Sequence, residues 1–263
     1  YNPETGEYDY QLLQTGDQFL SQSGISRNSD QTFYFDARLD WKRSFGDHNL
    51  TAMAMYMMRE YRSDVLPNRN QGYSGRVTYD YASKYLAEFN FGYNGSERLA
   101  AGHRFEFFPA VSAGWVASSE KFWEPISKYI NHFKIRGSYG LVGSDAFASG
   151  APHFLYQNNI GIGSAHNFWT GLPTSEISKK GPGFYVLAVQ DAGWEHVKKF
   201  DIGFDMMLFN QLNITFDYFH DKRERILMSR ASWPSMLGYW GSKPWSNIGA
   251  VSYTHLRAHE TPE

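Results

Sequence analysis

Apolar and polar residues alternate with a period of two over unusually long stretches of this chain. In residues 32–45, one set of alternate positions is mainly apolar and includes Phe33, Phe35, Ala37, Leu39, Trp41 and Phe45. The positions between them are polar or charged and include Asp36, Arg38, Asp40 and Lys42. Because successive side chains of a β-strand point to opposite faces, this stretch predicts a strand with one apolar and one charged face. Its length suits a tilted, bilayer-crossing strand of about 9–11 residues better than a soluble strand of about 5–6.

The same alternation predicts further strands along the chain. They cover residues 49–62, 73–81, 84–94, 105–117, 132–141, 197–209 and 212–220, and another strand starts at 247. A short helix is predicted over 118–129, where Ser119 has the character of an N-cap residue. The chain is therefore predicted to be all-β, with at most one short helix in a connection.

The lengths of the connections indicate the kind of sheet. Tight turns are expected at 46–48, 82–83 and 210–211, and long loops at 142–195 and 221–246. Antiparallel strands place successive connections at opposite ends of a sheet, so the tight turns collect at one end and the long loops at the other. This asymmetry is typical of outer-membrane barrels. The predicted fold is an antiparallel transmembrane β-barrel, of which the chain supplies about eight or nine strands.

Composition excludes several other classes. The chain has 263 residues, a net charge of −2, no cysteine and 17% aromatic residues, so nucleic acid is not expected as a partner. The mean hydropathy of −0.52 argues against helical membrane spans, which need about 20 mostly apolar residues in a row. It does not argue against a barrel, because barrel strands carry their lipid-facing residues only at alternate positions. The absence of cysteine excludes disulfides and thiolate metal sites.

Candidate catalytic and metal-binding residues are few. His255 and His259 have i,i+4 spacing and precede Glu260, but the acidic residue between the histidines of a zinc helix is missing. Six acids occupy alternate strand positions and are Asp36, Asp40, Glu88, Asp201, Asp205 and Asp217. With basic neighbours, they are best interpreted as a solvated lumen wall. We expect no enzyme activity, no metal and no cofactor.

Large aromatic residues in the predicted loops are the candidate binding residues. They are Trp169, Trp233, Tyr239, Trp240 and Trp245. Large apolar groups at a wet surface indicate a binding site, for instance for sugar rings or for a partner protein. The more common alternative in barrels is packing within their own loops or in the interfacial aromatic girdle. The strand aromatics assigned to that girdle are Trp41, Tyr73, Tyr81, Tyr85 and Tyr93.

Four ordered motifs resemble a known family. They are GRVTYDYASKYL at 75–86, FFPAVSAGW at 107–115, FKIRGSYG at 133–140, and Gly193-Trp-Glu followed by Asp201-Ile-Gly-Phe-Asp. They resemble the barrel of SusC/RagA-type TonB-linked (TonB-dependent) outer-membrane proteins of Bacteroidetes. The resemblance implies a 22-stranded barrel with a plugged lumen, integral in the outer membrane and in contact with its lipid. It also implies coupling to TonB, ExbB and ExbD, a SusD-like surface lipoprotein as a lid, and oligosaccharide or peptide cargo.

Residues 1–250 are expected to form part of a TonB-dependent receptor barrel domain. Residues 251–263 are expected to be a non-native tail, because VSYTHLRAHET at 251–261 resembles a translated sequencing adapter and shows no alternation. No plug, TonB box or C-terminal barrel strand is recognised, so we expect the chain to be an internal fragment of a longer protein.

Three functions are compatible with these observations. The first is a segment of a TonB-dependent transporter that imports oligosaccharides or peptides with a SusD-like partner. The second is a passive porin or adhesin-like outer-membrane barrel. The third is a soluble all-β carbohydrate-binding protein, which the length of the strands disfavours.

Overall fold

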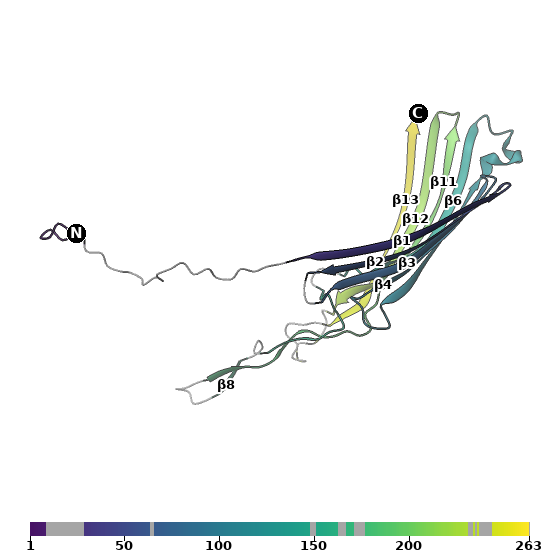
Figure 1. Ribbon diagram of the computed structural model, residues 1–263. Helices are drawn as coiled ribbons and strands as arrows, with labels where there is room; N and C mark the ends of the chain where they lie inside the picture. Colours follow the sequence, from purple (N-terminus) through teal and green to yellow (C-terminus); the bar gives the residue numbers. More distant parts are fainter. Residues whose placement is uncertain are drawn as a thin grey trace.

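The computed structural model describes residues 1–8, 29–63, 66–147, 151–162, 167–170, 177–230, 234, 236 and 244–262. Nine long strands of this part form one curved antiparallel sheet (Figure 1). In spatial order they are β1 (Gln31–Phe45), β2 (His48–Arg62), β3 (Asn68–Tyr81), β4 (Tyr85–Ser96), β5 (Phe105–Val116), β6 (Ile130–Ser144), β11 (Glu195–Leu208), β12 (Leu212–Ser229) and β13 (Trp245–Pro262). The prediction of a partial barrel wall is confirmed, because every strand pairs with its neighbour along the chain and the sheet has two edges, β1 and β13.

The strand register places the predicted apolar and charged positions on opposite faces. Leu39 pairs with Ala54, Ala54 with Gly75, and Gly75 with Phe91, so one face continues across β1 to β4. This apolar face contains Phe33, Leu39, Phe89, Phe91, Ile135, Phe204 and Phe216. The polar face contains Asp36, Glu88, Arg136, Asp205 and Asp217.

The two faces differ in shape and in their surroundings. A hollow of about 480 Å³ is lined mainly from the polar face, by residues that include Thr78, Glu88, Ser112 and Arg136. We assign the polar face to the lumen, because barrel strands turn their apolar face to lipid and their polar face inward. On the other face, large side chains such as Leu39, which is 72% exposed, find no protein partner to cover them. A contiguous apolar surface of this extent is expected where lipid is the solvent.

The methionine-rich segment of β2 also alternates between the polar and the apolar face. Met53 pairs with Asp40 and Arg76, which places it on the polar face together with Met55 and Met57. The alternation is blurred in the sequence here because thioethers take positions that are charged in the neighbouring strands.

The predicted helix at residues 118–129 is wrong. The segment forms two single 3₁₀ turns, η1 (Ala117–Ser119) and η2 (Lys121–Trp123), and then hydrogen-bonded turns. Ser119 ends the first turn and caps nothing. Glu120 interrupts the two turns with an extended backbone, φ −89° and ψ 149°, and this break prevents a continuous helix.

The long loops contain more strand than predicted. Strand β12 continues to Ser229, because its charged second half still pairs with β11 as far as Glu224 and with β13 as far as Ser229. Within 142–195 lie two small sheets, one formed by β7 (Asn159–Gly161) and β10 (Gly183–Val186) and the other by β8 (Asn167–Thr170) and β9 (Ile177–Lys180). Strand β13 runs through residues 251–262, paired with β12 although no alternation is visible there.

No helix in the described part of the chain is long and apolar enough to cross a membrane.

Candidate functional site at the loop end of the barrel wall

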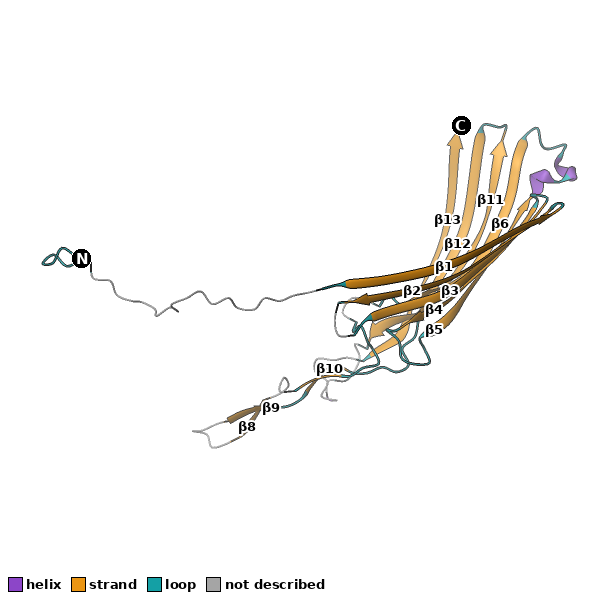
Figure 2. Cartoon of the chain, in the orientation of Figure 1, coloured by secondary structure: helices purple, strands orange, loops and turns teal. Residues whose placement is uncertain are grey.

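The long connections lie at one end of the sheet, which we call the loop end (Figure 2). They are residues 63–67, 97–104, 145–194 and 230–244. The opposite end, the turn end, carries the shorter connections 46–47, 82–84 and 209–211 and the 3₁₀ turns between β5 and β6. The predicted asymmetry is therefore present. In an outer-membrane barrel the end with long loops faces the outside of the cell.

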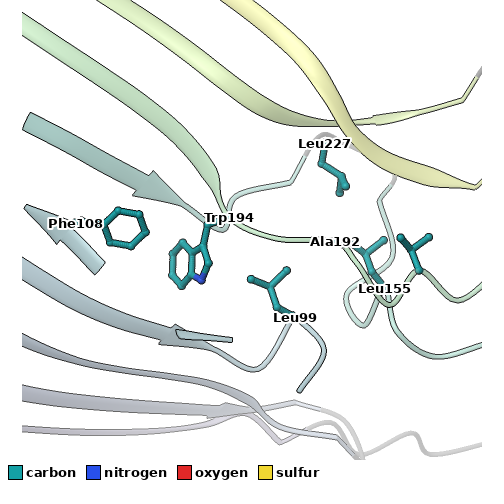
Figure 3. Close-up of a cluster of buried hydrophobic side chains, with 7 residues drawn as sticks. Leu99, Phe108, Leu155, Ala192, Trp194 and Leu227 are labelled. Carbon is teal, nitrogen blue, oxygen red and sulfur yellow. The ribbon is translucent and has the colours of Figure 1, made fainter. Parts of the chain in front are cut away.

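A buried apolar cluster fastens the longest connection to the wall (Figure 3). We call this group the loop-end cluster, and it consists of Leu99, Phe108, Leu155, Val189, Ala192, Trp194 and Leu227. Its members come from the β4–β5 loop, from β5, from the segment 145–194 and from β12. Partly buried residues, Trp245 among them, pack against it.

Trp194 is central to this cluster. Its ring meets that of Phe108 edge to face, with ring centres 5.4 Å apart, and its Nε1 donates a hydrogen bond of 3.0 Å to the carbonyl of Arg104. A buried indole N–H needs such a partner. Gly193 precedes it because a Cβ at that position would collide with the guanidinium of Arg225. The Trp of the Gly-Trp-Glu motif is thus explained by close packing at the loop end.

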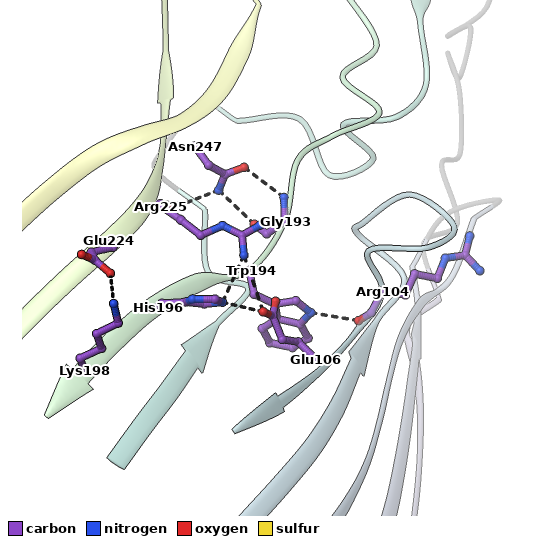
Figure 4. Close-up of polar contacts among 9 residues, drawn as sticks. All are labelled: Arg104, Glu106, Gly193, Trp194, His196, Lys198, Glu224, Arg225 and Asn247. Carbon is purple, nitrogen blue, oxygen red and sulfur yellow. Dashed lines mark hydrogen bonds and ion pairs between the residues drawn. The ribbon is translucent and has the colours of Figure 1, made fainter. Parts of the chain in front are cut away.

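A polar network lies beside the cluster (Figure 4). The side chain of Asn247 accepts a 3.0 Å hydrogen bond from the amide of Gly193 and donates to the carbonyls of Gly193 and Arg225. His196 and Glu106 are 2.8 Å apart, and Arg225 is 3.6 Å from the same carboxylate. Arg225 has a φ of 60°, in the region that favours glycine, next to a shift in the β12–β13 register. The network holds this irregular corner in one arrangement.

The first residues of the long connection are fixed separately. Asp145 accepts hydrogen bonds from Ser96 at 2.7 Å and from Asn70 at 3.0 Å, and its carbonyl accepts one from Arg98 at 2.8 Å. The Arg98 guanidinium also lies 4.3 Å from the ring centre of Phe147. Burial lowers the pKa of Arg98. Burial, and secondly the charge of Arg98, lowers the pKa of nearby His153.

The polar face carries opposite charges that neutralise one another. Arg136 lies 2.6 Å from Asp217 and 3.3 Å from Asp205, so it joins β6, β11 and β12. Arg76 is 3.6 Å from Glu88 on the neighbouring strand. Among the side chains that the structure describes, no group of three metal-ligating residues occurs. The arrangement is a hydrated wall of mixed charge, without the nucleophile and base of a catalytic site.

The predicted binding aromatics have different positions. Trp169, on β8, is 63% exposed, whereas Trp245 packs against the loop-end cluster at the start of β13. Trp233, Tyr239 and Trp240 lie outside the described residues. Of the girdle aromatics, Tyr81 and Tyr85 lie at the turn end, Tyr73 of β3 pairs with Tyr93 of β4, and Trp41 lies inside β1.

Sequence reasoning missed the residues that build the loop end, which are Glu106, Phe108, Trp194, His196, Arg225 and Asn247. They lie in four separate parts of the chain and follow no common period. The one available signal was the Gly193-Trp-Glu motif, whose packing role the sequence alone could not reveal.

No protein-family profile matches the chain. Among curated proteins of Formosa agariphila, TonB-dependent receptor P3 is 30% identical over 157 residues, which is 59% of this chain and 14% of that protein. TonB-dependent receptor P39 is 27% identical over 197 residues, 74% of this chain and 17% of that protein. The chain therefore spans about one seventh of the length of the curated relatives it matches.

Solved structures agree in fold. A structure of the RagAB peptide importer in the closed-closed state superposes with a TM-score of 0.70 at 17% identity, over 88% of this chain and 27% of that one. The siderophore receptor PirA from Pseudomonas aeruginosa gives a TM-score of 0.53 at 10% identity, over 88% of this chain and 40% of that one.

The fold and these similarities point to one class, the TonB-dependent β-barrels of the outer membrane, and the chain has the fold of a segment of such a barrel wall. Within that class, the resemblance to the SusC/RagA type is confirmed. The predicted outer-membrane location is likewise confirmed, and the similar proteins are receptors and importers, in agreement with the expectation that the chain is not an enzyme.

Proposed function

We propose that the protein of which this chain is a segment imports oligosaccharides or peptides across the outer membrane, with TonB coupling and a SusD-like surface lipoprotein as a lid. The observation that carries the proposal is the construction of the loop end, where a buried cluster and a polar network fix a long outward-facing connection to the wall. Binding residues are commonly placed on loops that a rigid scaffold positions. The similarity to an importer named for peptides supports the proposal.

Residues 1–250 are proposed to be barrel domain and 251–263 a non-native tail. Sequencing the gene beyond codon 250 tests this division: further alternating strands directly after residue 250 would support it, and the same VSYTHLRAHET segment would contradict it.

Uptake measurements in living cells test the function. Cells with the intact parent gene should accumulate a labelled oligosaccharide or peptide, and cells without it should not. Deleting tonB should abolish the same uptake, because import through a plugged barrel requires energy. Uptake that depends on the parent gene and persists without TonB would instead support a passive barrel. Co-purification of a lipoprotein with the tagged parent tests the lid.

The loop aromatics are proposed to contact cargo or lid. Replacing Trp233, Tyr239 and Trp240 together with Ala should lower the affinity of the parent protein for cargo or for the lid several-fold to about a hundredfold. Each aromatic contact contributes about 0.5–1.5 kcal/mol beyond burial. Barrel assembly, followed by a heat-modifiability gel, should be unchanged. Trp245→Ala is the comparison variant, because Trp245 packs on the loop-end cluster and should affect stability first. Normal uptake and lid binding in the triple variant would assign these three residues to packing.

A further inference from the structure

A small hollow lies on the outside of the barrel wall near the loop end. Its volume is about 250 Å³, and its lining includes Met58, Glu60, Arg69, Gln71, Glu97 and Phe105. Met58 pairs with Gln71, Gln71 with Gly95, and Gly95 with Phe105, so the floor of the hollow belongs to the apolar face. The hollow therefore opens away from the lumen, through which cargo would pass.

The strand register gives the position of the hollow relative to the two layers of the membrane. The adjacent row on the same face is aromatic and consists of Tyr56, Tyr73, Tyr93 and Phe107. Such aromatics mark the boundary between hydrocarbon and headgroups. The row of the hollow lies two residues further toward the loop end, or about 7 Å along each strand. This distance places the hollow in the headgroup layer of the outer leaflet.

The lining of the hollow combines planar polar groups with an aromatic ring. Glu60 accepts hydrogen bonds from Arg69 at 2.8 Å and from Arg62 at 2.9 Å. The ring of Phe105 covers Gly95, where any Cβ would collide with it, and lies 5.3 Å from the ring of Tyr93. Carboxylate, guanidinium and amide groups can each bond two neighbouring hydroxyls, and a ring face suits the C–H side of a sugar.

Glu97 adds a second carboxylate to the lining, and Arg69 lies 3.9 Å from one of its oxygens. The volume is below the range of about 300–1,000 Å³ usual for drug-sized ligands, which suits a single sugar ring.

We propose that this hollow binds the sugar headgroup of an outer-leaflet glycolipid, whose acyl chains lie along the exposed aromatic row below it. Glu60, Arg69 and Gln71 bond the hydroxyls, and Phe105 packs on the ring. The lipid fixes the height of this wall segment in the membrane.

The test uses the parent receptor in phosphatidylcholine nanodiscs. Native mass spectrometry would measure binding of lipid A, of phosphatidylglycerol and of a free glucosamine disaccharide. We expect lipid A to be retained in preference to both others. Equal retention of phosphatidylglycerol would reduce the site to an anion contact, and equal binding of the disaccharide would assign it to soluble sugar; either result overturns the proposal.

Two variants address the site itself. Gln71→Trp fills the hollow without removing a charge, and Arg69→Gln removes a donor; each should weaken lipid A retention about tenfold or more, the effect of losing one or two bonds to a charged group. Arg59→Gln is the matched control, because Arg59 lies on the neighbouring strand β2, paired with Asn70, and on the polar face. A heat-modifiability gel reports assembly of every variant. Retention unchanged in an assembled Gln71→Trp variant would overturn the proposal, even if Arg69→Gln failed to assemble.

Discussion

In the barrel wall the large apolar side chains are the exposed ones, whereas at the loop end they are buried. Tyr139 on the apolar face is 52% exposed, while Leu99 and Leu227 in the loop-end cluster are fully covered. The wall is held by continuous strand pairing and takes lipid as its solvent. The loop end is packed like a small soluble protein, with its own apolar cluster and satisfied polar network. One chain therefore follows two opposite burial rules, and the boundary between them lies near the membrane surface.

The largest expected effect concerns the wall as a whole. Residues 1–250 produced alone should be insoluble without detergent and should not form a heat-modifiable barrel, because the sheet has two unpaired edges and an exposed apolar face. Sedimentation and size-exclusion chromatography check this. A monodisperse soluble monomer would contradict the membrane assignment and with it the comparison.

The next effect should appear at the loop end alone. In the parent receptor, Trp194→Ala should destabilise the attachment of residues 145–194 by about 3–5 kcal/mol, the usual range for a buried Trp replaced by Ala. Limited proteolysis should then cut this connection sooner while the wall stays protected. Trp169→Ala, at an exposed Trp of the same connection, should leave the cutting rate unchanged. Equal protection in both variants would show that the cluster does not anchor the connection.

A smaller effect is expected on the polar face. Arg136→Met removes the cation between Asp205 and Asp217 and should lower the free energy of unfolding in detergent by about 1 kcal/mol, a low value because the guanidinium is partly exposed. Arg38 bonds an acid on its own strand, so Arg38→Met should cause no measurable change. If both variants unfolded at the same urea concentration, the charges of the wall would be interchangeable.

The smallest effect depends on pH and should be confined to the loop end. Burial holds the pKa of His153 below its value of about 6.5 in an unstructured chain, so the detached segment binds a proton more readily than the attached one. The attachment of the connection should therefore weaken as the pH falls below about 6.5. The weakening should continue until the pH reaches the lower pKa that His153 has in the attached segment. Proteolysis of the parent at several pH values checks this, with His153→Gln expected to flatten the profile. A steeper profile in that variant would contradict it.

The wall could be predicted from the sequence because the patterns that specify its strands and turns lie between near neighbours in the chain. The strands at residues 32–45 and 49–62 agree with β1 and β2 nearly to the residue, since the period of two and the turn residues between them lie side by side in the chain. Prediction was weaker where the wall leaves the membrane. The sequence predicts a loop for the charged half of β12, because beyond the lipid neither face needs to be apolar and the alternation disappears.

The candidate binding residues show the same division. Trp169 and Trp245 look alike in the sequence, yet one is exposed on a short strand and the other packs on a cluster. Nothing adjacent to either residue distinguishes them. Their difference depends on which distant segments lie beside them.

The sequence by itself determined the all-β class, the two faces of most of the long strands and the separation of tight turns from long connections, because alternation and turn chemistry act between near neighbours in the chain. Only the tertiary structure decided that Leu99, Leu155, Trp194 and Leu227 share one cluster, and that Glu60, Gln71 and Phe105 share one hollow. Contacts of this kind arise when the strand register and the path of a long connection bring remote residues together, and no local period encodes them.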